Sequence, residues 1–336
     1  MNNPELPRVV VLSTGGTIAG RGNSTMSLSE YTAGAVAGAE LVAAVPELTQ
    51  FARVEVEQIS NIGSSNMTIA IWRALADRIN ALFAADAGVA GVVITHGTST
   101  IEETAYFLNM TVRHDRPVVL VGAQRPATAL SADGPLNLVN AVRTAASPDS
   151  RGRGVLVVLN DEINAARDVT KSNTYRAETF RSGELGFLGY VDQDKVAYYR
   201  APDKRHTARS EFDLRAIPAL PGVDIVYASV DARTPLIVAA LQSAGVRGII
   251  FAATGAGALS DEERDIVRRT VAAGGDTVFV RSTRVANGRV IGRPDFDALG
   301  IIAADNLSPQ KARILLMLAL ATTQDVPTLR RIFAEY

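Results

Sequence analysis

The sequence predicts an α/β protein with a larger N-terminal domain, built on a doubly wound and mainly parallel sheet, and a smaller C-terminal α/β domain. Short runs rich in Val, Ile and Leu alternate with helical patterns, which is the βαβα order of a parallel sheet covered on both faces. The length of 336 residues exceeds that of a usual single domain. A polar stretch with three prolines interrupts the pattern after residue 200.

The elements of each domain follow from two patterns. Near-continuous apolar runs predict buried strands, and apolar residues at helical spacing predict the helices between them. In the N-terminal domain, 1–200, the predicted strands are 8–13, 91–95, 117–122 and 154–160, and the helices 69–85, 100–112 and 136–146. Residues 201–222 are predicted to be a linker. In the C-terminal domain, 223–336, the predicted strands are 223–229, 248–253 and 277–281, and the helices 235–244, 260–273, 308–322 and 326–334.

The composition excludes several classes of function. A net charge of −1 gives no electrostatic footprint for nucleic acid or an anionic membrane. Cysteine is absent, which removes disulfides, thiolate catalysis and thiolate metal sites. The three histidines, His96, His114 and His206, lie far apart in the sequence, so neither a His-rich metal site nor a Ser-His-Asp triad is predicted. No signal peptide or membrane span is visible, which favours the cytoplasm; a trimmed periplasmic protein stays an alternative.

Four loops follow predicted strands or precede predicted helices, where open α/β sheets bind ligands. In "TGGTIAG" (14–20), two glycines would let the backbone approach a ligand, and Thr17 follows them. The alternative is a tight turn with an incidental threonine. The spacing fits neither a dinucleotide nor a P-loop motif. In "NIGSSNM" (61–67), small residues before a helix suit a carboxylate or a plain helix cap.

The third and fourth loops carry more hydroxyls and a lysine. In "ITHGTSTIEE" (94–103), Ser99 and Glu102 fit a capping box with Ser99 as N-cap, which leaves His96, Gly97 and Thr98 unexplained. In "RDVTK" (167–171), Lys171 is either a functional group or a surface charge.

Taken in order, "TGGTIAG", "NIGS", "THGT" with "EETAYFL", "RP" with "SADGP", "RDVTK" and "PQKAR" resemble the bacterial-type L-asparaginase and glutaminase family over nearly the whole chain. The resemblance implies α/β subunits that assemble as homotetramers from tight dimers, with each site completed by the second domain of a neighbour. It also implies hydrolysis of a small-molecule amide by a threonine nucleophile, without a metal or cofactor.

The resemblance assigns roles by motif. Thr17 would be the nucleophile, Tyr31 of the lid would assist its deprotonation, and Thr98 and Lys171 would be the second threonine and the lysine. Substrate contacts are expected from Gly63, Ser64, Ser65, Ser99, Ala123 and Arg293, with Ser64 on the substrate carboxylate. The chemistry agrees, because a threonine hydroxyl needs a base and these loops offer tyrosine and lysine. Free side chains of both kinds titrate near pH ~10, so a base of either kind needs a lowered pKa.

Three departures from the family pattern bear on the substrate. Ser99 stands where the family has an aspartate that pairs with the α-ammonium of asparagine, and Ala256 where it often has asparagine. Arg293 lies near the position of an acidic partner residue, a role that Asp295 could take over. Because an unpaired buried ammonium is costly, the sequence predicts a substrate with a carboxylate and an amide but no free α-ammonium. The loss of a carboxylate at position 99 also predicts a lower pKa for Lys171 than with aspartate present.

Other functions remain as alternatives. One is an ordinary L-asparaginase or glutaminase, and another is a non-catalytic small-molecule binding protein, against which the joint presence of the threonines and the lysine argues. A nucleotide-binding oxidoreductase fails on loop spacing. A tRNA-dependent amidotransferase subunit is conceivable, but no RNA-binding domain or basic face is visible.

Overall fold

The computed structural model describes residues 6–336, which divide into two compact units with the boundary between Ser210 and Glu211. The boundary falls inside the stretch 201–222 that was predicted to be a linker. Residues up to Ser210 belong to the first unit, where the Ser210 hydroxyl donates to the Met110 carbonyl and His206 is buried. This polar segment is therefore packed against a helix over its first half.

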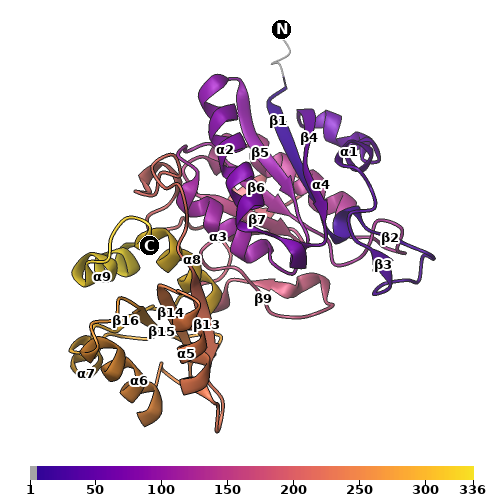
Figure 1. The fold of residues 1–336 in the computed structure, drawn as a ribbon. Helices are drawn as coiled ribbons and strands as arrows, with labels where there is room; N and C mark the ends of the chain where they lie inside the picture. The colour runs from indigo at the N-terminus through magenta and orange to yellow at the C-terminus, as the bar shows by residue number, and fades with distance from the viewer. Residues whose placement is uncertain (1–5) are drawn as a thin grey trace. The chain divides into compact units, whose positions relative to one another are not determined.

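The first unit is built on an eight-stranded sheet in the order β12-β11-β8-β7-β6-β5-β1-β4 (Figure 1). Its strands are β1 (Arg8–Gly15), β4 (Arg53–Ile62), β5 (Val89–Thr95), β6 (Val118–Val121), β7 (Val155–Leu159), β8 (Glu162–Ala165), β11 (Gly189–Val191) and β12 (Val196–Tyr198). The five neighbouring strands β4, β1, β5, β6 and β7 are parallel, and β8, β11 and β12 extend the sheet with antiparallel pairing. The predicted mainly parallel sheet is confirmed, and all four predicted strands of this domain are present.

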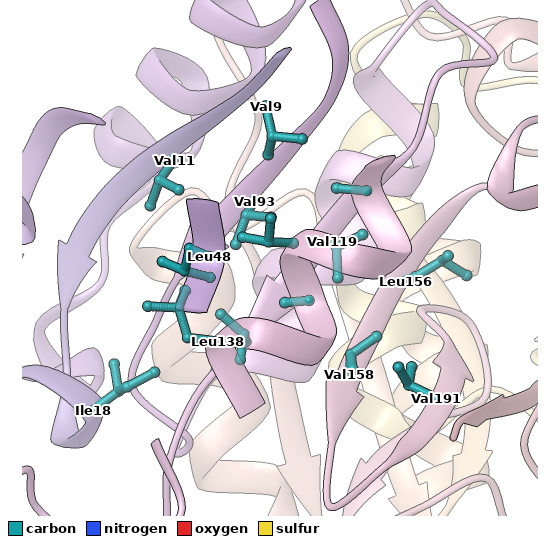
Figure 2. Close-up of a cluster of buried hydrophobic side chains, with 14 of the residues drawn as sticks. Val9, Val11, Ile18, Leu48, Val93, Val119, Leu138, Leu156, Val158 and Val191 are labelled. Atoms are coloured by element: carbon teal, nitrogen blue, oxygen red, sulfur yellow. The ribbon is translucent and has the colours of Figure 1, made fainter. Parts of the chain in front are cut away.

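Helices cover both faces of this sheet, as the doubly wound class requires. They are α1 (Gly38–Ala43), α2 (Ile69–Ala85), α3 (Ile101–Thr111) and α4 (Gly134–Ala146). Alternate residues of a strand point to opposite faces, so Val9 and Val11 of β1 join Leu138 of α4 in one apolar cluster (Figure 2). On the other side α2 and α3 pack against each other and the sheet. The predicted helices at 69–85, 100–112 and 136–146 match α2, α3 and α4 closely.

Two antiparallel ribbons lie outside the large sheet, and both bear on the site. The strands β2 (Arg21–Gly22) and β3 (Tyr31–Thr32) form one, and β9 (Thr170–Lys171) and β10 (Phe180–Arg181) form the other. Figure 1 shows both at the end of the sheet toward which the β1 arrow points, below the sheet in that view. Ligands of open α/β sheets bind at this end.

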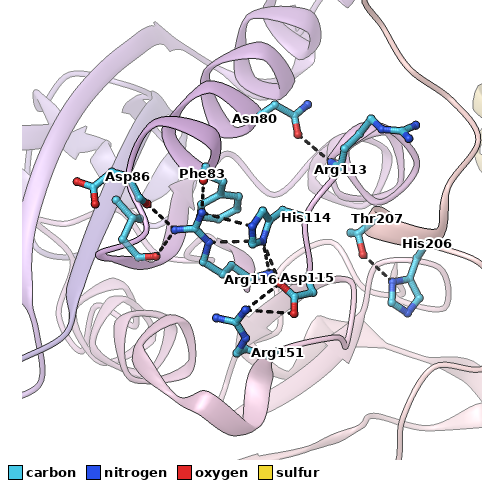
Figure 3. A network of polar contacts seen from close by, with 11 residues as sticks. Asn80, Phe83, Asp86, Arg113, His114, Asp115, Arg116, Arg151, His206 and Thr207 are labelled. Carbon is cyan, nitrogen blue, oxygen red and sulfur yellow. Dashed lines mark hydrogen bonds and ion pairs between the residues drawn. The ribbon is translucent and has the colours of Figure 1, made fainter.

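The buried Arg116 holds together the chain segments before β5 and β6 (Figure 3). Its Nη1 donates to the carbonyls of Asp86 and Val89, each at 2.7 Å, and its Nη2 donates to the carbonyl of Phe83. Carbonyls at the end of a helix lack partners within that helix. The guanidinium therefore supplies hydrogen-bond donors to the carbonyls at the end of α2 and holds the neighbouring strands in place. Its role is structural.

The second unit holds a four-stranded parallel sheet in the order β13-β14-β15-β16. Its strands are β13 (Val223–Tyr227), β14 (Gly248–Ala253), β15 (Val278–Thr283) and β16 (Ile302–Ala303), and its helices are α5 (Thr234–Ser243), α6 (Asp261–Ala272), α7 (Pro294–Asp297), α8 (Pro309–Leu320) and α9 (Val326–Glu335). Val226, Phe251 and Ile266 lie in its apolar core. The predicted smaller α/β domain is confirmed; the short elements β16 and α7 were not predicted.

Within residues 6–336 no helix has the length and apolar character that crossing a membrane requires.

Candidate active site

Three loops at the carboxyl ends of the strands meet through their backbones. Gly15 and Gly16, at the end of β1, have φ of 101° and 84°, which favours glycine. A Cβ on Gly16 would lie 2.3 Å from the nitrogen of Gly97, and the Gly16 nitrogen donates to the Ile62 carbonyl at 2.9 Å. Side chains at these glycines would separate the loops, so the "TGG" and "HG" glycines are needed for the close approach.

Thr17 follows the first glycine pair and meets Tyr31. Thr17 opens a short 3₁₀ turn, Thr17–Ala19, and only 8% of the residue is exposed. Its Oγ1 lies 2.7 Å from the Tyr31 hydroxyl, and either oxygen can donate. Tyr31 is half-buried on β3, and its ring packs so near Gly20 that a Cβ there would lie 2.8 Å from Cδ2. The pair has the reach that proton transfer between a nucleophile and a base requires.

Thr98 and Lys171 form a second hydroxyl-base pair. Lys171 Nζ donates to Thr98 Oγ1 at 2.7 Å, and Thr98 is buried. Burial lowers the pKa of Lys171 below its ordinary value, against the field of Glu102, which raises it. A lysine with a lowered pKa is more often neutral near pH ~7, and only the neutral amine can act as a base. Burial is the main cause of this shift, and the effect expected from the missing carboxylate at position 99 stays a prediction.

Ser64 lies beside the THGT loop. Its Oγ accepts from the Ser99 nitrogen at 3.1 Å, and its carbonyl accepts from the Thr100 hydroxyl at 2.8 Å. A hydroxyl that accepts one hydrogen bond still has its own hydrogen to donate. Gly63 beside it is half-buried and Ser65 is exposed. The N-cap of α2 is Thr68, whose side chain accepts from the Ile71 nitrogen, so the alternative of a plain helix cap within residues 61–67 is wrong.

The predicted capping box of Ser99 and Glu102 is also wrong. The N-cap of α3 is Thr100, and it makes no side-chain cap bond. Ser99 is exposed and its backbone nitrogen is used by Ser64. Glu102 is buried, and its Oε2 accepts from the backbone nitrogen of Lys171 at 2.6 Å. The tertiary partner prevails because a hydrogen bond to a carboxylate contributes more than a surface cap does.

The remaining predicted substrate residues divide between the two units. Ala123 is fully buried after β6, and the neighbouring Gly122 lies close to the Thr98 methyl group. Arg293 lies in the second unit as the N-cap of α7, and its guanidinium makes two 3.0 Å hydrogen bonds to the Asp295 carboxylate. Both side chains are exposed, so the pair adds little to stability.

His96 is buried in a chain of hydrogen bonds that the sequence did not predict. The Trp72 indole donates to Thr104 Oγ1 at 2.7 Å, Thr104 Oγ1 lies 2.9 Å from His96 Nε2, and His96 Nδ1 lies 2.7 Å from the Gly97 carbonyl. A carbonyl only accepts, so Nδ1 carries the proton and Nε2 accepts from Thr104. Burial lowers the pKa of His96 to about 4. The neutral ring therefore orients the Gly97–Thr98 peptide.

Glu102 is a residue of this candidate site that was not predicted from the sequence. A capping pattern accounted for it locally, and no sequence signal links it to a lysine 69 positions later. Within residues 6–336 no group of three or more His, Asp or Glu side chains is placed to hold a metal ion.

Comparison with known proteins adds to this geometry. Residues 8–204 match the family model "Asparaginase, N-terminal", and residues 222–333 match "Glutaminase/Asparaginase C-terminal domain". The chain is 47% identical over 332 residues to L-asparaginase 2 of Bacillus subtilis (strain 168), covering 99% of this chain and 87% of that protein. It is 45% identical over 336 residues to the glutaminase-asparaginase of Pseudomonas fluorescens biotype A, covering 99% and 91%.

A solved structure is also similar. The crystal structure of a probable cytoplasmic L-asparaginase from Campylobacter jejuni superposes with a TM-score of 0.95 at 44% identity, over 98% of this chain and all of that one. A third relative, L-asparaginase 2 of Escherichia coli (strain K12), is 46% identical over 334 residues, covering 98% of this chain and 94% of that protein.

Proposed function

Because this chain belongs to the asparaginase and glutaminase family, and is thereby a hydrolase of amide C–N bonds, we propose that it hydrolyses the side-chain amide of L-asparagine with Thr17 as nucleophile. One observation carries the proposal: two hydroxyl-base pairs, each 2.7 Å apart, follow two glycines whose backbones touch. The names of the relatives support L-asparagine as the substrate.

The chemistry proceeds in two halves. In the first half, Tyr31 takes the proton of the Thr17 hydroxyl while the Thr17 oxygen attacks the amide carbonyl. The C–N bond then breaks as the leaving nitrogen gains a proton and departs as ammonia. Water then adds to the ester on Thr17 and releases the free acid. Splitting one difficult step into two is what a covalent nucleophile contributes. The Thr98–Lys171 pair, joined by a 2.7 Å hydrogen bond, serves the second half-reaction, in which it takes the proton of the attacking water.

The substrate carboxylate is proposed to lie against Ser64. Its hydroxyl hydrogen is not used in accepting from Ser99, so it can donate to an anion. Hydrogen bonds to a charged group contribute about 1.5–3 kcal/mol. Gly63 and Ser65 flank it without a bulky side chain, and Ser65 is exposed.

A second candidate is a monoamide that lacks the α-ammonium. It is favoured by the exposed Ser99, which offers no carboxylate beside the THGT loop, and by Arg293 if a neighbour presents it. The names of the relatives do not support this altered choice. Succinamic acid, which is asparagine without the amino group, separates the two candidates in a direct comparison of kcat/KM.

The Ser99→Asp variant tests whether position 99 faces the ammonium. We expect the ratio of kcat/KM for L-asparagine to that for succinamic acid to rise by about tenfold or more, because an added ionic hydrogen bond contributes more than ~1.4 kcal/mol. Ammonia release from both substrates is measured in wild type, Ser99→Asp and the neutral control Ser99→Asn. An unchanged ratio in Ser99→Asp would show that this side chain does not contact the ammonium.

The working unit is proposed to be a homotetramer built from two dimers, with Arg293 or Asp295 of a neighbour completing each site. The family relationship supports it. Sedimentation at the assay concentration is expected to show all activity in an assembly larger than one chain, and a fully active monomer would remove the proposal. The cytoplasmic location predicted from the sequence stays a prediction, because the relatives include one named cytoplasmic and one named periplasmic.

A further inference from the structure

Glu102 is a buried carboxylate on α3 next to the proposed catalytic lysine. Only 6% of Glu102 is exposed. Its Oε2 accepts the backbone N–H of Lys171 at 2.6 Å. A hydrogen bond from a backbone nitrogen to an ionised carboxylate is short and about twice as strong as a neutral one. The contact therefore ties the start of α3 to the strand that carries the lysine.

Lys171 is held at both ends by one stretch of chain. Its Nζ donates to Thr98, and its main-chain nitrogen donates to Glu102, four residues further along. The strand β9 is only two residues long and pairs with β10 alone. Such a short ribbon has few bonds of its own to hold the lysine in place, so the Glu102 contact sets where the side chain begins.

Among the charged groups around Lys171, Glu102 is the carboxylate that acts on its ammonium. Opposite it on β10 stands the apolar Phe180, while Arg181 stands opposite Thr170 and pairs with Glu162 at 3.6 Å. Before β9, Asp168 pairs with Arg167 at 3.5 Å. Position 99 is serine. The field of Glu102 raises the pKa of Lys171, while burial lowers it.

We propose that Glu102 is the positioning residue for Lys171, holding its main chain and supplying the negative charge that balances its ammonium. The inference rests on the proposed function, in which the Lys171–Thr98 pair moves a proton. It gives one chain segment two functions: Thr98 receives the lysine side chain, and Glu102 keeps the lysine in place and adjusts how readily it loses its proton.

The test separates the charge of Glu102 from its hydrogen bond. Glu102→Gln keeps a carbonyl oxygen for the Lys171 nitrogen but removes the charge. Loss of an opposite charge lowers the pKa of an ammonium, so the Lys171 pKa should fall by about one unit. The acidic limb of the kcat profile should move to lower pH by the same amount, because Lys171 serves the second half-reaction. Glu102→Ala, which also loses the hydrogen bond, should in addition lower the plateau of kcat.

The Lys171 pKa can be read without turnover. The chain has four lysines, Lys171, Lys195, Lys204 and Lys311, so lysine labelled with ¹³C at Cε gives four NMR signals to follow against pH. The Lys171 signal is the one that disappears in Lys171→Met. The matched control is Glu103→Gln, which removes the same charge from the next residue of α3 and should leave the titration of Lys171 unchanged.

Two results would overturn the inference. One is a Lys171 titration that is the same in wild type and Glu102→Gln, and the other is an equal shift in Glu103→Gln. Failure of the proposed function has a different signature, since it shows as wild-type protein that releases no ammonia from either amide. The NMR titration does not depend on that activity, so the two failures are distinguishable.

Discussion

Thr17→Ala is expected to lower kcat/KM for L-asparagine by about four orders of magnitude or more, because removing a nucleophile removes the covalent pathway. Stability should change little. The variant loses the hydrogen bond between Thr17 Oγ1 and the Tyr31 hydroxyl, which is worth about 0.5–1.5 kcal/mol. A loss of that size moves Tm by only a few degrees in a chain of this length. Ammonia release and thermal unfolding are measured on the same purified sample.

The matched control is Thr17→Ser, which keeps a hydroxyl beside Tyr31 and should retain far more activity than the alanine variant. If Thr17→Ala keeps turnover near that of wild type, Thr17 is not the nucleophile. The role would then pass to Thr98, a buried hydroxyl beside Lys171.

Lys171→Met is expected to lower kcat by about 10²–10⁴-fold, the usual contribution of a positioned acid or base. Methionine fills much of the same volume without a charge. Its backbone nitrogen still donates to Glu102, so β9 should stay in place. Thr98→Ala should cause a similar loss, and the double variant should be little worse than either single one, because residues that act as a unit are not additive.

Lys195→Met serves as the control for Lys171→Met. It removes the same charge from an exposed lysine of the same unit and should leave kcat unchanged. A Lys171→Met protein with at least a tenth of wild-type kcat would show that the lysine only orients Thr98.

The central strands were predictable because their burial requires an almost continuous apolar run in the sequence. A strand covered on both faces, such as β5 or β7, must be apolar at nearly every position. The edge strand β4 was not predicted, since its partly exposed residues include Arg53, Glu55 and Glu57. The short antiparallel strands β8, β11 and β12 have too few residues to show a pattern.

The catalytic candidates were predictable in part for a related reason. Parallel strands end at one edge of a sheet, so loops that follow them meet there, and Thr17 and Thr98 follow β1 and β5. Tyr31, Ser64 and Lys171 were chosen by resemblance to a family. The structure brings Tyr31 to Thr17, Lys171 to Thr98 and Ser64 to the backbone of Ser99.

The sequence by itself determined the two α/β domains, the main strands and the hydroxyl-rich loops, because local apolar periodicity and strand-end position carry that information. Only the tertiary structure decided what Ser99 and Glu102 do. A local capping pattern paired them, but the unsatisfied backbone nitrogens of Ser99 and Lys171 found acceptors in Ser64 and Glu102. A hydrogen bond to a carboxylate contributes about 1.5–3 kcal/mol, while an exposed cap contributes about one, so for Glu102 the partner distant in sequence prevailed over the neighbour.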